Sequence, residues 1–76
     1  MRSIGRVSEF GDLLRAIRTR AGLSEWDLSQ EIGVGLQTVR DWESGAAKPK
    51  VLEMTVLRDV FGDDVYAELV RARTRD

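Results

Sequence analysis

Four glycines divide most of this chain into short segments, and each segment has the apolar spacing of an α-helix. Gly22, Gly33, Gly45 and Gly62 each follow a stretch in which apolar side chains recur every three or four residues. This period places them on one face of a helix. Glycine commonly ends a helix, because it adopts the left-handed conformation after the last turn at no steric cost. The chain can therefore form only short helices with tight connections.

The segments between these glycines predict five helices, over residues 9–21, 25–32, 36–44, 51–61 and about 63–73. Ser8 is a candidate N-cap for the first helix, and Ser24 with Asp27 has the spacing of a capping box for the second. No stretch alternates with the period of two that a strand requires, and no hairpin turn separates apolar runs. The predicted fold is a compact, all-α, five-helix domain that occupies residues 1–76.

The same spacing predicts the core side of each helix. The predicted core positions are Phe10, Leu13, Leu14, Ile17, Ala21, Leu28, Ile32, Val39, Trp42, Val51, Met54, Leu57, Phe61, Val65, Tyr66, Leu69 and Val70. Trp26 is left without an assigned neighbour, and it either covers the first helix or packs on a partner. The helix over 25–32 has only about two turns, so it depends on tertiary neighbours.

The residue types that are absent exclude several kinds of chemistry. The 76 residues contain no cysteine and no histidine, so disulfides, thiolate or imidazole metal ligands, cysteine nucleophiles and histidine bases are unavailable. We therefore expect no catalytic site, no metal, no cofactor and no small-molecule substrate, and hence no enzyme. Apolar runs are far shorter than the roughly 20 residues that cross a bilayer, and the first residues lack a signal-peptide block. These features predict a soluble, cytoplasmic protein without a membrane contact.

The net charge of −1 hides an uneven distribution. Residues 1–23 carry five arginines against two acids, which gives +3, whereas residues 24–45 carry one arginine against five acids, which gives −4. Lys48 and Lys50 follow this acidic segment. Basic charge therefore flanks an acidic middle, and this pattern matters for any charged partner.

The helix predicted at residues 36–44 has two distinct faces. At 100° per residue, Val39 and Trp42 fall on one arc together with Thr38 and Glu43. The opposite arc carries Leu36, Gln37, Arg40, Asp41 and Ser44. The valine and the tryptophan indicate the side that faces the core, so the second arc either contacts a partner or is a solvated surface.

Residues Phe10 to Gly62 resemble the phage repressor and Cro family, also called the XRE-type helix-turn-helix family. The resemblance is carried by GDLLRAIRTRAGLS, DLSQEIGV, TVRDWESG and the following KP, which align without gaps. It implies a lambda-repressor-like DNA-binding domain with the helix-turn-helix motif at about residues 24–45. In such a motif the second helix enters the major groove of double-stranded DNA.

The resemblance also implies which residues contact DNA. The implied base-reading residues are Leu36, Gln37, Arg40, Asp41 and Ser44. The implied phosphate contacts come from Arg15, Ser24, Glu25, Gly35, Lys48 and Lys50. Gln37 fits the edge of adenine, and Arg40 fits guanine or a phosphate. For Arg15, Arg18 and Arg20, a solvated helix face is the alternative interpretation.

Three positions depart from the family pattern. Glu25 stands where the family usually has a glutamine that binds phosphate, and Asp41 stands where arginine, lysine or glutamine is common. Gly35 replaces the serine or threonine that usually caps the recognition helix. Acids at a phosphate-facing surface repel DNA. We therefore expect weak binding by the monomer and a dependence on dimerisation.

These features predict a sequence-specific transcriptional regulator, such as a repressor, that binds double-stranded DNA as a homodimer in the cytoplasm of a bacterial cell. A phage-encoded protein fits equally. The stripe of Leu52, Val56 and Val60 and the fifth helix with its tail at 63–76 are the candidate dimerisation elements, or they simply wrap the core. The alternative is a protein-interaction module, an antirepressor or accessory subunit, that uses the acidic residues of the middle segment.

Overall fold

Five α-helices and no β-strand are present in residues 8–76, which the computed structural model describes. The helices are α1 (Glu9–Arg20), α2 (Glu25–Ile32), α3 (Leu36–Ser44), α4 (Val51–Phe61) and α5 (Asp63–Arg75). The predicted all-α, five-helix fold is confirmed, although α1 ends one residue earlier and α5 extends two residues further than predicted. Residues 1–7 lie outside the described residues. The predicted domain includes them, and the expectation that the chain has no signal peptide concerns them.

Glycines and short polar side chains set the helix ends. The four glycines that punctuate the sequence have φ angles from 77° to 97°, a region that residues with a Cβ rarely adopt. At the start of α2, Ser24 Oγ accepts a hydrogen bond from the Asp27 amide, and Asp27 Oδ2 accepts one from the Ser24 amide, each at 3.0 Å. The predicted capping box is therefore confirmed.

The start of α1 is capped from two directions. Ser8 Oγ accepts from the Gly11 amide at 3.0 Å, as predicted. The Asp76 carboxylate, at the end of α5, accepts from the Ser8 hydroxyl at 2.8 Å and from the amides of Glu9 and Phe10 at 2.9 Å. Burial raises the pKa of Asp76, but the hydrogen bonds and nearby Lys48 outweigh it, and the net pKa lies below its usual range.

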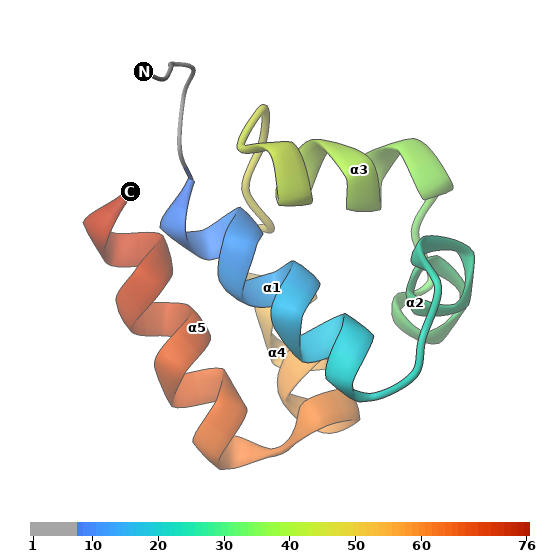
Figure 1. Ribbon diagram of the computed structural model, residues 1–76. Helices are drawn as coiled ribbons and strands as arrows, with labels where there is room; N and C mark the ends of the chain where they lie inside the picture. Colours follow the sequence, from blue (N-terminus) through green and yellow to red (C-terminus); the bar gives the residue numbers. More distant parts are fainter. Residues whose placement is uncertain (1–7) are drawn as a thin grey trace.

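Helix α1 runs through the middle of the domain, with α3 on one side and α5 on the other (Figure 1). Helix α4 passes behind α1 in this view and packs against α5, while α2 contacts both α3 and α4. The arrangement places α2 and α3 together at one side of the domain. Helix α3 lies at an edge, so one of its faces is turned away from the other helices (Figure 1).

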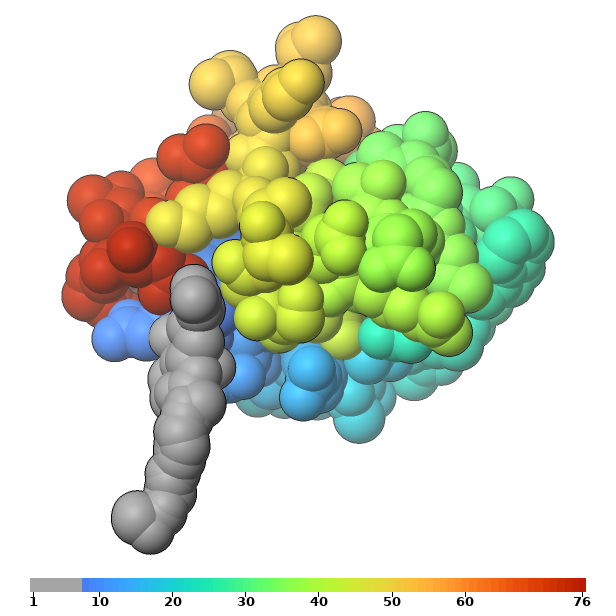
Figure 2. Space-filling view, turned by 90° about the horizontal axis from the view of Figure 1, so that it is seen from above, coloured from blue at the N-terminus to red at the C-terminus, as the bar shows by residue number. Residues whose placement is uncertain are grey.

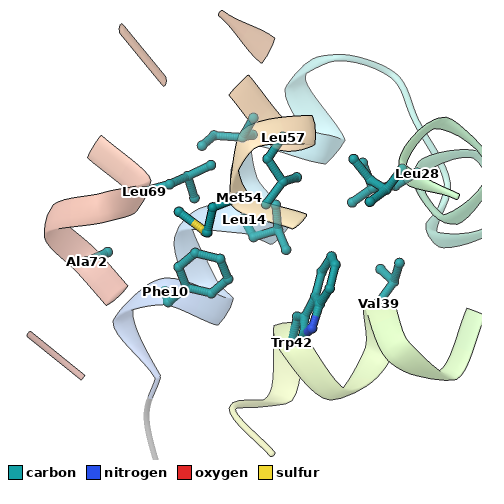
Figure 3. Packing of buried hydrophobic residues seen from close by; sticks show 11 residues of the cluster. Phe10, Leu14, Leu28, Val39, Trp42, Met54, Leu57, Leu69 and Ala72 are labelled. Atoms are coloured by element: carbon teal, nitrogen blue, oxygen red, sulfur yellow. The ribbon is translucent and has the colours of Figure 1, made fainter. Parts of the chain in front are cut away.

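Buried side chains from all five helices form one apolar core (Figure 3). Its members are Phe10, Leu14, Ile17, Leu28, Ile32, Val39, Trp42, Met54, Leu57, Leu69 and Ala72. Trp42, only 1% exposed, and Val39 reach from α3 toward this cluster. Burying a large apolar side chain stabilises a fold by about 1.5–3 kcal/mol, so these two residues hold α3 in place.

Three predicted core positions are wrong. Val51 is 79% exposed, Val70 is 36% exposed, and Ala21 is an exposed C-cap. Helical periodicity gives the direction of a side chain, but a neighbouring element must also cover it. Ala72, which was not predicted, is buried. Trp26 is 57% exposed.

At Gly11, α1 lies directly against the backbone of α3. A Cβ atom built on Gly11 would lie 2.3 Å from the backbone oxygen of Glu43, which is far inside a normal contact. The first helix therefore meets the backbone of α3 directly, without a side chain between them. This contact, together with Trp42, sets the position of α3 on the domain.

Candidate nucleic-acid interface

Helices α2 and α3 and the short turn between them form the candidate interface. The amides of Gly33 and Val34 both donate to the Ser29 carbonyl, at 2.8 and 3.0 Å, and so close the last turn of α2. Helix α3 begins directly after Gly35, which has an extended backbone and makes no side-chain cap. Two short helices are thus joined by a tight, glycine-containing turn. This is the helix-turn-helix arrangement.

The two predicted faces of α3 are present. Val39 and Trp42 are buried, whereas Gln37, Arg40 and Ser44 are exposed. Leu36 and Asp41 are half-buried at the borders of the exposed side. In the space-filling view of Figure 2, α3 lies openly across the visible surface of the domain. All five predicted base-reading residues therefore border or occupy one accessible surface, and their contacts with bases stay a prediction.

Glu43 is a buried acid that belongs to the interior of the domain. Its side chain is only 1% exposed, and its carboxylate accepts from Arg18 Nε at 2.6 Å and from Arg18 Nη2 at 3.1 Å. Arg15 Nε lies 3.4 Å from the same carboxylate. The hydrogen bonds that Arg18 donates to Glu43 raise the pKa of the Arg18 guanidinium, against the effect of burial. This two-point contact ties α1 to α3.

Two further contacts organise the exposed face of α3. Arg40 Nε donates to Glu25 Oε1 on α2 at 3.2 Å, and Gln37 Nε2 donates to Asp41 Oδ1 at 3.0 Å. The polar groups expected to read bases are therefore already paired with carboxylates. Both contacts lie in solvent, where such pairs contribute little to stability and can exchange.

The predicted phosphate contacts are spread over three elements. Lys48 and Lys50 are exposed in the loop after α3, and the Arg15 side chain is 57% exposed on α1. The Ser24 amide is occupied by the capping box, so it is not free for a phosphate. Arg18 on α1 is only 13% exposed and is held by Glu43, so a solvated position does not describe it. The contacts of these residues with phosphates stay a prediction.

The acidic residues of the middle segment differ in burial and in their partners. Of its five acids, Glu43 is buried, Asp27 caps α2, Glu25 and Asp41 each contact a neighbouring side chain, and Glu31 is exposed. The acidic residues of this segment that reach the surface are therefore Glu25, Asp27, Glu31 and Asp41, and their use as a binding face stays a prediction. Residue types reveal the charge count, but only the fold shows which charges reach the solvent unpaired.

No group of three or more acidic side chains between residues 8 and 76 is placed to hold a metal ion. Across these same residues, no helix has the length and apolar character needed to span a membrane.

The fold and the exposed face of α3 define a helix-turn-helix protein. Residues 9–65 match the family described as helix-turn-helix domain, and this match covers most of the chain. The chain therefore belongs to the helix-turn-helix domain family. No curated protein and no solved structure gave a significant match to it.

Sequence reasoning missed two features that position this interface. The contact of Glu43 with Arg18 joins residues 25 positions apart, and nothing in the local pattern pairs them. Gly11 did carry a signal, because an isolated glycine inside a helix costs about 1 kcal/mol relative to alanine and implies a packing reason. That reason is the backbone of α3.

Proposed function

We propose that this protein is a sequence-specific regulator of the phage repressor and Cro type, which places α3 in the major groove of double-stranded DNA. The observation that carries the proposal is the uncovered face of α3, with Gln37, Arg40 and Ser44 exposed. The opposite face of the same helix is held by Trp42 and by the pair of Glu43 with Arg18. A rigidly held helix with a free polar face can present donors and acceptors to base edges.

Cations around this face supply the contacts to the DNA backbone. Lys48 and Lys50 follow α3, and Arg15 lies on the adjacent α1. Phosphate contacts fix the register of a protein on the duplex and set the dependence of its affinity on salt. Only a few cations are available here, so a single domain binds weakly.

A homodimer compensates for this weak single-site binding. Val51 and Leu52, which are 79% and 80% exposed at the start of α4, give the domain an apolar surface for a second copy. Two recognition helices in such a dimer contact half-sites about 34–36 Å apart. Both recognition helices then bind the same face of one duplex, so the dimer binds more tightly than a single domain.

The alternative, a protein-interaction module, is supported by one observation. Trp26 is 57% exposed at the start of α2, and tryptophan is enriched in protein interfaces. Burial of Glu43 against Arg18 reduces the number of acids that the middle segment offers to such a partner from five to four. If the protein does not bind duplex DNA, this alternative becomes the better explanation of the exposed Trp26.

A fluorescence-anisotropy titration with duplex DNA at about 50 mM and about 200 mM salt tests the proposed function. We expect binding that weakens steeply as salt increases. Selection of bound duplexes from a random pool then yields the operator and its half-site spacing. Absence of binding at low salt, or binding that does not respond to salt, would refute the DNA-binding proposal.

Gln37 and Lys48 are expected to contribute differently. Gln37→Ala removes a base contact, so it should change the selected sequence and reduce discrimination at one position by about 1–3 kcal/mol. Lys48→Ala removes a phosphate contact, so it should weaken all duplexes alike and reduce the salt slope by about one unit. Titrations of both variants with selected and scrambled duplexes make this comparison. Identical behaviour of the two variants would contradict the division into reading and phosphate-binding residues.

A further inference from the structure

In the free protein, Arg40 forms an ion pair with Glu25. The same guanidinium is one of the groups that the proposed function brings to the DNA. Arg40 lies on the exposed face of α3, but its Nε is held 3.2 Å from Glu25 Oε1. Glu25 is the first residue of α2, where the helix dipole favours a negative charge. The two side chains remain 54% and 32% exposed, so an approaching anion can reach the guanidinium.

A DNA phosphate and the Glu25 carboxylate are chemically similar acceptors. Both are oxyanions that form charge-assisted hydrogen bonds with a guanidinium. When a phosphate binds the Arg40 guanidinium, the ion pair with phosphate replaces the ion pair with Glu25. The Glu25 carboxylate is then left unpaired near the DNA backbone. The carboxylate and the phosphates then repel each other. The ion pair in the free protein thus reduces the binding free energy that Arg40 contributes with any duplex.

We propose that Glu25 is an intramolecular competitor of DNA for the Arg40 guanidinium, and that it thereby lowers the sequence-independent affinity for duplex DNA. This inference rests on the proposed function of α3. A lower contribution from phosphate contacts increases the relative weight of base contacts such as that of Gln37. Glu25 is therefore a specificity-determining residue that touches no base.

A double-mutant cycle on the full chain tests this role. The four proteins are the wild type, Glu25→Gln, Arg40→Gln and the double variant, each titrated with scrambled duplex at about 50 mM and about 200 mM salt. We expect Glu25→Gln to bind about two- to fivefold more tightly, the fold-change that corresponds to an exposed ion pair. The salt slope should steepen by about one unit, because Arg40 is free to neutralise a phosphate. In the Arg40→Gln background, the same change should have less than about twofold effect.

Glu68→Gln is the matched control, because it neutralises an exposed glutamate on α5, which packs against α1 and α4. Circular dichroism confirms that all variants keep their helices. An equal effect of Glu25→Gln in both Arg40 backgrounds would overturn the inference, since Glu25 would then act only as a general repulsive charge. If the wild type binds with normal salt dependence but Glu25→Gln behaves like Glu68→Gln, the inference alone fails. If the wild type does not bind duplex DNA, the proposed function fails, and the inference fails with it.

Discussion

At the scale of single residues, Glu43 is counted from the sequence as a surface acid, but in the fold it is a buried partner of Arg18. It adds to the acidic count of the middle segment, yet its carboxylate is buried and holds Arg18 at two points. A buried charge is stable only when its partner is present and well oriented. Glu43 is thus part of the support of α3 and contributes no free negative charge to the surface.

Glu43→Gln tests this role. The neutral amide cannot pair both Arg18 contacts, and the guanidinium stays in a site that is only 13% exposed. We expect a loss of about 1–3 kcal/mol in the free energy of unfolding, measured by urea denaturation. Glu31→Gln, an exposed glutamate on α2, is the control and should stay within about 0.5 kcal/mol of the wild type. Equal stability of the two variants would show that the buried pair does not hold α3.

At the scale of helices, the packing of α1 on α3 depends on a missing side chain. Alanine favours a helix over glycine by up to about 1 kcal/mol, so Gly11→Ala would stabilise an isolated α1. In the domain, the new Cβ would lie 2.3 Å from the Glu43 carbonyl oxygen. We therefore expect a net loss of about 1–3 kcal/mol, which thermal and urea unfolding both measure. Thr19→Ala, on the exposed side of α1, should be tolerated, and a Gly11→Ala protein that is equally stable would contradict the close approach.

The start of α2 gives a pH-dependent prediction. The hydrogen bond from the Ser24 amide, helped by that from the Ser24 hydroxyl, lowers the pKa of Asp27. The pKa of this carboxylate is lower in the folded state than in the unfolded state, where it is about 3.9. Its full contribution to stability is therefore present at pH values above the unfolded pKa, and it is lost as the pH falls through the folded pKa. Asp27→Asn should therefore be less stable than the wild type at pH values above about 5, and the difference should shrink below about pH 4. Urea unfolding across this range measures it, and a constant difference would exclude an ionised cap.

At the scale of the whole molecule, the exposed start of α4 is the surface that the proposed dimer requires. Leu52→Gln should leave the fold of the monomer intact, because Leu52 is 80% exposed. It should weaken self-association at least about tenfold, since burial of a leucine contributes about 1.5–3 kcal/mol. Sedimentation velocity with and without duplex DNA measures the stoichiometry. Ala16→Gln, at an exposed position of α1, is the control, and unchanged association of Leu52→Gln would place any dimer contact elsewhere.

Much of the fold is predictable because its determinants are local. Glycines at the helix ends, the Ser24 and Asp27 box and the apolar period together predict the five helices to within two residues. The exposed face of α3 is predictable for the same reason, since Val39 and Trp42 reveal which side is buried. The failures at Val51, Val70 and Ala21 lie where periodicity alone cannot show whether another helix covers the position.

By itself, the sequence determined the number of helices, their ends and the side of α3 that is free, because these depend on contacts within a few residues. Only the tertiary structure decided which charges are available. It buried Glu43 against Arg18, paired Arg40 with Glu25, and brought Asp76 to the start of α1. The physical reason is that the energy of a charge depends on its burial and its partner. In this chain, the partners come from distant positions that only folding brings together.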